Sequence, residues 1–171
     1  MKILVTDASI FIDLYDCDAY DSFFKLPYEI ITTYQVWHEL DPEQHRVLNK
    51  WVESEKLTIL KIEEDFVAKT AGKGLSKSLS VADLSVWFAC DSKGDILLTS
   101  DGTLRKMARR HGMDTHGLLW IFKEFVDHKT LTAAMAVDKL EIVFNQNIYY
   151  RSDQKLIKAF EEMKRQLKSG N

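Results

Sequence analysis

The sequence predicts an α/β fold with a mainly parallel central sheet. Short apolar or β-branched runs alternate along the chain with segments that have helical periodicity. One run, Ile96-Leu97-Leu98, is continuously apolar, which is typical of a parallel strand covered on both faces. With 171 residues, 46% of them hydrophobic, the chain is long enough to form one compact domain with a substantial core.

The first part of the chain contains three strand signals, at residues 3–5, 28–33 and 57–62. The second of them is rich in β-branched residues, which favour strands. A helix is expected after each strand, the first of them carrying Ile10, Phe11 and Leu14. The second runs from Tyr34 to Leu40, and at Pro42 either this helix restarts or a new helix begins. The third spans residues 64–71.

The stretch at residues 78–110 organises the rest of the prediction. It indicates an apolar helix, a turn at residues 92–95, the buried strand at 96–98 and a second helix. Beyond it we expect an edge strand at residues 113–115 and helices at residues 118–126 and 131–143. An aromatic turn at residues 145–150 then precedes a last helix at residues 154–168. The predicted division is a domain at residues 1–150 and an amphipathic terminal helix at 151–171 that packs on the domain or on a partner.

Composition excludes several classes of function. The formal net charge of −3 does not suggest a general nucleic-acid binder, so a site for a polyanion needs a local basic patch or a bound cation. Cys17 and Cys90 match no metal or redox spacing, which fits a reducing compartment. No window approaches a membrane span, and the apolar run at the start is too short for a signal peptide. A cytoplasmic protein that does not associate with membranes is therefore expected.

Two aspartates share one sequence context. Asp7 and Asp101 each follow an apolar strand and a small hydroxyl residue, and each precedes a helix. Parallel strands would place both carboxylates at one edge of the sheet, where open α/β sheets bind ligands. Asp83 lies at the start of a helix and Glu39 near one, so all four can face that edge.

Clustered carboxylates repel one another unless a cation neutralises them. An oxygen-only ligand set suits Mg²⁺ or Mn²⁺, which can activate water and stabilise charge on a phosphoryl oxygen. The simpler alternative is that the aspartates are helix caps. Ser80 and Asp83 have the spacing of a capping box, and Asp101 can cap the helix after it. Glu39 taken alone fits a solvated helix residue.

Three segments in order resemble the motifs of PIN-domain nucleases. Residues 5–14 (VTDASIFIDL) look like the first motif, residues 80–83 (SVAD) like the central motif and residues 97–101 (LLTSD) like the third. Glu39, within VWHEL, falls where the family carries a helix glutamate. The resemblance covers roughly residues 3–140.

The resemblance implies a three-layer α/β/α fold and a metal-dependent ribonuclease that hydrolyses RNA phosphodiester bonds with Mg²⁺ or Mn²⁺. Its implied catalytic residues are Asp7, Glu39, Asp83 and Asp101, of which Asp7, Asp83 and Asp101 would ligate the metal. Ser9, Ser80 and Ser100 would support these carboxylates by hydrogen bonds. Many small family members are toxins of toxin–antitoxin pairs, so the resemblance also implies an antitoxin partner and a homodimer.

Basic residues flank the predicted site in the sequence. A basic helix face is usually only solvated, yet it is also where a phosphate backbone can rest. The candidates for RNA binding are Arg105, Lys106 and Arg109, then Lys73 and Lys77.

Two alternatives to the nuclease remain. Many PIN proteins carry a further acid shortly after the third motif, whereas residues 102–105 (GTLR) supply none. A catalytically weak or inactive module that binds RNA or protein is therefore one alternative. The other is a phosphatase or phospho-acceptor domain that uses a single aspartate, but Asp7 lacks the second aspartate that haloacid-dehalogenase phosphatases carry two residues later.

Overall fold

The computed structural model describes residues 2–63, 65–71, 73–75, 77–93 and 95–169. The chain forms two compact units, each built from two segments. The first comprises Met1–Ile12 and Pro27–Gly117, and the second comprises Asp13–Leu26 and Leu118–Asn171. The chain passes from one to the other within helix α1 (Ala8–Asp16). The predicted boundary at residue 150 stays a prediction.

The first unit is built on a parallel sheet. In the part of the chain that the structure describes, five strands pair in the order β3-β2-β1-β4-β5, and every pair is parallel. The strands are β1 (Ile3–Thr6), β2 (Glu29–Thr33), β3 (Leu57–Leu60), β4 (Ile96–Leu98) and β5 (Thr115–His116). The strand order reverses beside β1, and such a switch point is where open α/β sheets leave a crevice at the carboxyl ends of their strands.

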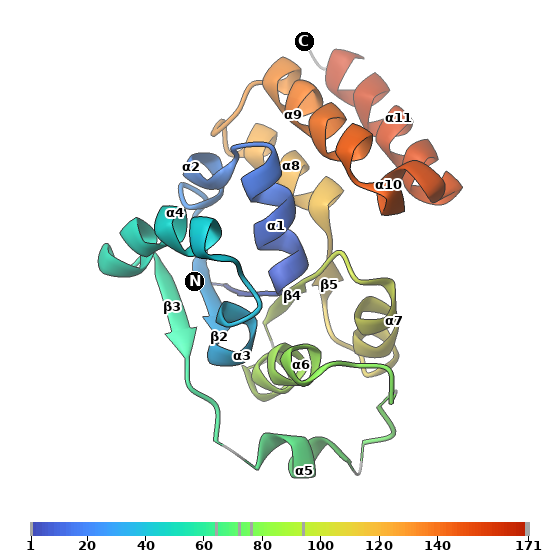
Figure 1. The fold of residues 1–171 in the computed structure, drawn as a ribbon. Coiled ribbons are helices and arrows are strands. Elements are labelled where there is room, and N and C mark those ends of the chain that lie inside the picture. Colours follow the sequence, from blue (N-terminus) through green and yellow to red (C-terminus); the bar gives the residue numbers. More distant parts are fainter. Residues whose placement is uncertain (1, 64, 72, 76, 94, 170–171) are drawn as a thin grey trace. The chain divides into compact units, whose positions relative to one another are not determined.

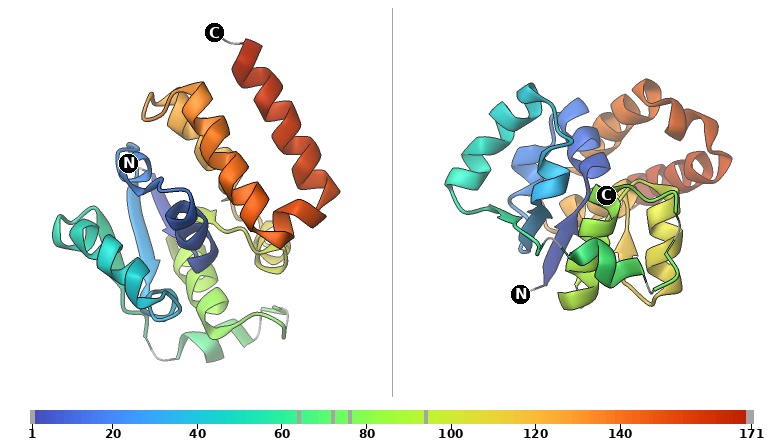
Figure 2. Two further views of the ribbon diagram at one scale, coloured as in Figure 1. Left: turned by 45° about the horizontal axis from the view of Figure 1, so that its top comes forward. Right: turned by 60° about the horizontal axis from the view of Figure 1, so that its bottom comes forward.

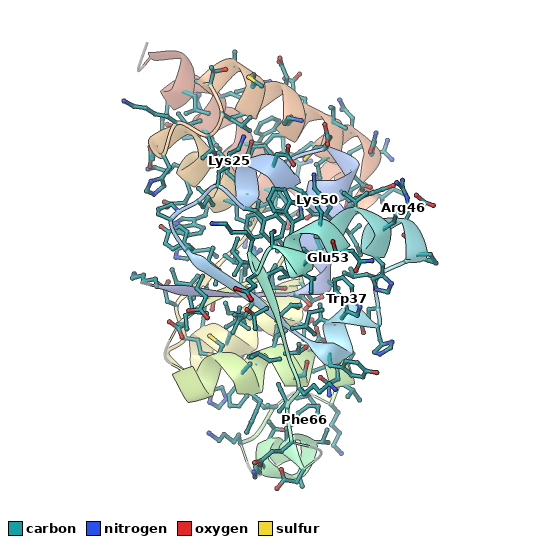
Figure 3. All side chains as sticks on the ribbon, turned by 90° about the vertical axis from the view of Figure 1, so that its left-hand side faces the viewer. Lys25, Trp37, Arg46, Lys50, Glu53 and Phe66 are labelled. Carbon is teal, nitrogen blue, oxygen red and sulfur yellow. The ribbon has the colours of Figure 1, made fainter. Side chains whose placement is uncertain are left out.

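Helices flank this sheet (Figure 1). The apolar helix α6 (Val81–Lys93) packs on β1, β2 and β4, and six of its residues at 81–90 are buried, as the sequence predicted for a core helix. Phe66 of α5, labelled in Figure 3, lies 6.3 Å from Phe88 of α6 between ring centroids. The helices are α3 (Tyr34–Trp37), α4 (Pro42–Glu53), α5 (Phe66–Ala71), α6 (Val81–Lys93) and α7 (Gly102–Arg110). The predicted α/β/α class with a parallel central sheet is confirmed. Glu64 and Gly94, which fell in a predicted helix and a predicted turn, lie outside the described residues.

One helix ends earlier than the sequence pattern indicated. A helix was expected from Tyr34 to Leu40, but α3 ends at Trp37, and Glu39 lies in the turn that follows. The reason is the next helix. Asp41 adopts an extended conformation to cap α4, with Pro42 in its first turn, and a residue before proline is disfavoured in helical conformation.

The last strand is also displaced from its predicted place. A strand was expected at residues 113–115, whereas β5 spans Thr115–His116. The residues just before β5, Gly112 and Met113, form the C-terminal cap of α7. Gly112 has a φ of +76°, and the Met113 N–H donates to the carbonyl of Ala108 at 3.0 Å, so the helix closes with a glycine C-cap before the chain can enter the sheet.

The second unit is helical. Figure 2 shows α9 and α11 as neighbouring helices, and the ring of Phe160 on α11 stacks on Phe144 of α9 with centroids 4.4 Å apart. The predicted aromatic turn at residues 145–150 is instead the end of α9 followed by a short helix, α10 (Ile148–Ser152), which begins where the Asn147 side chain accepts the Tyr149 N–H. The helices are α2 (Tyr20–Phe23), α8 (Leu118–Asp127), α9 (Ala133–Gln146), α10 (Ile148–Ser152) and α11 (Gln154–Ser169).

Long-range polar contacts join the two segments of this unit. The Tyr150 hydroxyl donates to the buried Asp13 carboxylate. The Lys139 Nζ donates to the carbonyl oxygens of Cys17 and Asp18, both at 2.7 Å, and so closes the C-terminal end of α1. These contacts fix the early segment against helices more than a hundred residues later.

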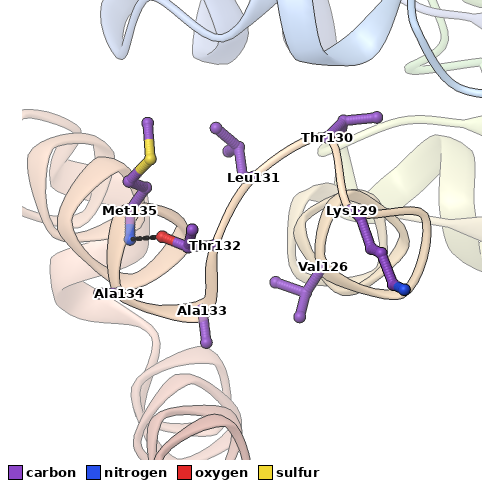
Figure 4. Close-up of a pocket in the computed structure, with 8 residues that line it drawn as sticks. All are labelled: Val126, Lys129, Thr130, Leu131, Thr132, Ala133, Ala134 and Met135. Atoms are coloured by element: carbon purple, nitrogen blue, oxygen red, sulfur yellow. Dashed lines mark hydrogen bonds between the residues drawn. The ribbon is translucent and has the colours of Figure 1, made fainter. Parts of the chain in front are cut away.

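A pocket of about 530 Å³ lies at the turn between α8 and α9 (Figure 4). It is lined by Val126, Lys129, Thr130, Leu131, Thr132, Ala133, Ala134 and Met135. This lining contains no carboxylate, so the pocket does not offer the acidic site that the sequence predicts.

Across the described residues, the helices are all too short or too polar to cross a membrane.

Candidate acidic site at the ends of β1 and β4

Asp7 is the buried centre of the site. It follows β1 directly, and only 4% of its surface is exposed. Its Oδ1 accepts the Ala8 N–H at 2.8 Å, and its Oδ2 accepts the hydroxyls of Ser9 at 2.6 Å and Thr99 at 2.8 Å. Burial raises the pKa of Asp7 above its ordinary value, these hydrogen bonds lower it, and the charge of Asp83 raises it again.

Two further carboxylates, Asp83 and Glu39, interact with this site through charge. Asp83 lies in the first turn of α6, and Glu39 lies in the turn after α3. Burial raises the pKa of Glu39, and the charges of Asp7 and Asp83 raise it further. Asp7, Glu39 and Asp83 therefore face one electrostatic environment although they come from three separate elements.

Asp83 also caps its own helix. The Ser80 N–H donates to Asp83 Oδ2 at 2.7 Å, and the Asp83 N–H donates to Ser80 Oγ at 3.0 Å. This is the reciprocal capping box that the sequence spacing suggested. One carboxylate oxygen of Asp83 is thus used by the helix, while its charge still reaches Asp7.

Asp101 is joined to the site mainly through its backbone. Its Oδ1 accepts the Leu104 N–H at 2.6 Å and caps α7, and its own N–H donates to Thr99 Oγ1 at 3.0 Å. The adjacent Ser100 N–H donates to Ser9 Oγ at 2.9 Å. The charges of Asp7, Glu39 and Asp83 thus interact with one another. Asp101 is instead connected to Asp7 by hydrogen bonds that pass through hydroxyl groups.

Two parallel relays run from the β4–α7 connection to Asp7. The hydroxyls of Ser9 and Thr99 each accept a backbone N–H, from Ser100 and Asp101 respectively, and each donates its own proton to Asp7 Oδ2. Chains of this kind strengthen each hydrogen bond in them. Thr99 was not among the predicted site residues. Its signal was its position between a buried strand and Asp101, where it is fully buried.

Replacing Thr99 by valine should lower the free energy of unfolding by roughly 2 kcal/mol, because a buried carboxylate loses a hydrogen-bond donor. It should also raise the pKa of Asp7 further. Urea unfolding measures the first effect. Thr99→Ser keeps the hydroxyl and is the matched control, so equal losses in the two variants would contradict the relay.

The predicted RNA-binding cations are placed differently from one another. Arg105 and Arg109 of α7 donate to main-chain carbonyls next to the sheet, those of Thr99 at 2.6 Å and Thr115 at 3.2 Å. Lys106 is exposed on the same helix. The Lys73 Nζ lies 5.3 Å from the Trp87 ring centroid, and Lys77 is exposed. The two arginines therefore have a structural role whatever else they bind.

The donor set suits a hard divalent cation. All candidate ligand atoms are oxygens, and the raised pKa values of Asp7 and Glu39 reflect burial and mutual repulsion that a cation would relieve. Among the described residues, no three acidic, histidine or cysteine side chains lie close enough together to hold an ion directly. A divalent cation that keeps several of its waters, as Mg²⁺ does, needs only one or two direct carboxylates, so it does not require three such side chains close together.

Comparison with known proteins gives a family. Residues 3–164 match the family described as DUF3368, a PIN domain. No curated protein matches the chain. Among solved structures, one similar chain is a domain of a functionally unknown protein from Methanocaldococcus jannaschii DSM 2661, with a TM-score of 0.49 and 18% identity over 69% of this chain and 91% of that one. Since the family match spans almost the whole chain, this protein belongs to the PIN-domain family, whose fold is of the nuclease type.

Proposed function

We propose that this PIN-domain protein is a ribonuclease that hydrolyses RNA phosphodiester bonds and depends on Mg²⁺ or Mn²⁺. The observation that carries the proposal is the buried carboxylate of Asp7 at the end of β1, which shares its electrostatic environment with Asp83 and Glu39. Concentrating negative charge in a desolvated place is costly. It is an arrangement expected where a divalent cation binds.

In this proposal Asp7, Asp83 and Asp101 would hold the cation, one or two of them directly and the rest through its bound waters, and Glu39 would contact it directly or through water. When bound, the cation lowers the pKa of a water molecule and stabilises charge on a phosphoryl oxygen. The chain supplies the remaining functions. Ser9, Thr99 and the Ala8 N–H fix both oxygens of Asp7. Glu39, with its raised pKa, is suited to accept a proton at a carboxylate oxygen.

The test is cleavage of a labelled single-stranded RNA by the purified protein. We expect cleavage with Mg²⁺ or Mn²⁺, its loss in EDTA and its return when the metal is restored. Asp101→Asn should also lose cleavage while its thermal midpoint stays the same, because asparagine caps a helix as well as aspartate does. Full cleavage by this variant would reduce Asp101 to a cap, and cleavage that persists in EDTA would remove the metal from the proposal.

One set of observations favours the alternative of a binding module with little or no activity. Asp83 and Asp101 each give a carboxylate oxygen to a helix start, at 2.7 and 2.6 Å. Such a module would bind the same RNA with unchanged affinity in EDTA and in Mg²⁺ and would leave it intact in both.

In its finer form the proposal makes the protein the toxin of a toxin–antitoxin pair, acting in the cytoplasm, with an antitoxin protein and a second copy of the chain as partners. Its support is the resemblance to small single-domain PIN proteins. An adjacent or overlapping reading frame for a small DNA-binding protein would favour this role, and its absence would count against it.

A further inference from the structure

An exposed aromatic pair lies next to Glu39 in the first unit. The side chain of Tyr34 is 46% exposed, and its ring lies edge-on to the ring of His38, with centroids 4.2 Å apart and planes at 77°. Among the phenylalanine, tyrosine and tryptophan side chains that the structure describes, only Tyr34 and Tyr149 are exposed, and Tyr149 belongs to the second unit. Tyr34 is thus an aromatic residue of the first unit that leaves much of its surface open to a ligand, five residues before Glu39.

The helix that carries this pair is fixed to the helix that carries Asp83. Thr33 caps α3 by accepting the Val36 N–H at 3.2 Å, and its hydroxyl lies 2.6 Å from that of Ser85 on α6. Because Ser85 donates its proton to the carbonyl of Ala82, Thr33 is the donor of this bond. Both hydroxyl residues are fully buried. Tyr34 is therefore held in a set position relative to the first turn of α6.

The far end of α3 is held as well. Trp37, labelled in Figure 3, stacks on His45 of α4, with centroids 4.5 Å apart and planes at 16°. The His45 Nε2 also lies 2.7 Å from the Trp37 carbonyl oxygen. Preorganisation of this kind removes much of the entropy cost of ordering a side chain on binding.

Charge does not supply binding at this place. The chain has a net charge of −3, and the residue after His38 is Glu39, whose pKa the neighbouring Asp7 and Asp83 help to raise. Two cations of α7 are already bonded to main-chain carbonyls. A nucleic acid that approaches this part of the acidic site must gain affinity from a contact that is indifferent to charge, and stacking of a base on an aromatic ring is such a contact.

We propose that Tyr34, braced by His38, forms a base-stacking subsite that binds the face of an unpaired nucleobase in single-stranded RNA. Its place beside Glu39 puts that base next to the phosphate that is cut, and this part of the inference rests on the proposed function. Bases within a duplex are covered on both faces by their neighbours, so the subsite selects single strands.

The test measures binding separately from cleavage. The probe is a fluorescein-labelled single-stranded RNA of about twelve nucleotides, and its anisotropy is followed with the full chain in EDTA. Tyr34→Ala and Tyr34→Leu should each weaken binding by about 5- to 150-fold, whereas Tyr34→Phe should bind as the wild type does. Tyr149 of the second unit is 41% exposed, close to the 46% of Tyr34, so Tyr149→Ala is the matched control and should leave binding unchanged. A thermal midpoint for each variant excludes loss of fold.

A salt series adds a second readout. The loss caused by Tyr34→Ala should stay the same at every salt concentration. Changing the exposed Lys106 and Arg110 together to alanine should instead flatten the salt slope by about 1.4, at about 0.7 for each phosphate contact. A change of slope in Tyr34→Ala would mean that the residue acts through phosphate and would overturn stacking.

The outcomes distinguish the subsite from the nuclease. If the wild type cleaves RNA and Tyr34→Ala binds and cleaves it equally well, the subsite is wrong and the ribonuclease stands, with this surface left to a protein partner. If neither the wild type nor its variants cleave RNA but Tyr34→Ala still loses affinity, the proposed ribonuclease activity is wrong and the stacking subsite stands. Retained affinity in Tyr34→Leu would overturn stacking in favour of a merely apolar contact.

Discussion

Exchange of Asp7 for asparagine is expected to lower the rate of RNA cleavage by about a thousandfold, equivalent to roughly 4 kcal/mol of lost transition-state stabilisation. Asp7 is the most buried of the candidate ligands, and three hydrogen bonds fix its two oxygens. An amide has the same shape but lacks the charge that holds a cation. Single-turnover cleavage of a labelled RNA by variant and wild type measures the ratio.

The same variant should be at least as stable as the wild type when metal is absent. Because the folded state raises the pKa of Asp7 above 3.8, the folded protein binds a proton more tightly than the unfolded chain does. The free energy of unfolding of the metal-free wild type therefore falls as pH rises from about 3.8 through the pKa of the folded state, and Asp7→Asn should lose this share of the fall. Asp65→Asn, an exposed carboxylate paired with Lys69, is the control and should keep both the activity and the pH profile.

Replacing Phe160 by alanine should lower the free energy of unfolding by about 3–5 kcal/mol. This ring is 5% exposed and stacks on Phe144, so its removal leaves a cavity between α11 and α9. Urea unfolding followed by circular dichroism gives the value. Glu162→Ala on the same helix removes a surface ion pair with Arg165 and an exposed hydrogen bond from Gln166, and it should change stability by less than about 1 kcal/mol. A loss as small for Phe160→Ala would mean that α11 contributes little to the fold.

Most of the sheet could be predicted from the sequence because its longer strands are short apolar or β-branched runs. Residues 96–98 had no polar alternation, and the structure buries all three of them beside β1. The extent of α3 could not be read in the same way. The sequence pattern extended the helix through Glu39 to Leu40, but α3 ends at Trp37 because Asp41 is extended and caps α4. Local capping therefore overrode the helical pattern at Glu39, one of the candidate site residues.

Hydrogen bonds between residues that are distant in the sequence could not be predicted, for a different reason. The contexts of Asp7 and Asp101 predicted that both follow strands and that Asp101 can cap the next helix, and the structure bears out both. The role of Thr99 depends on a bond across 92 residues, which no local pattern encodes. Likewise, the α7 spacing that suggested a phosphate-binding face for Arg105 and Arg109 carried no information on the carbonyls that receive them.

The second unit is made of two stretches of chain that lie far apart in the sequence. The bonds from Tyr150 to Asp13 and from Lys139 to Cys17 span 137 and 122 residues. A growing chain cannot complete this unit until most of the protein has been synthesised, and closing such long loops slows folding. Expression of residues 118–171 alone would leave Tyr150 and Lys139 without Asp13 and Cys17. We therefore expect a C-terminal fragment of residues 118–171 to be less stable than the same unit within the full chain, because it lacks the partners of these bonds.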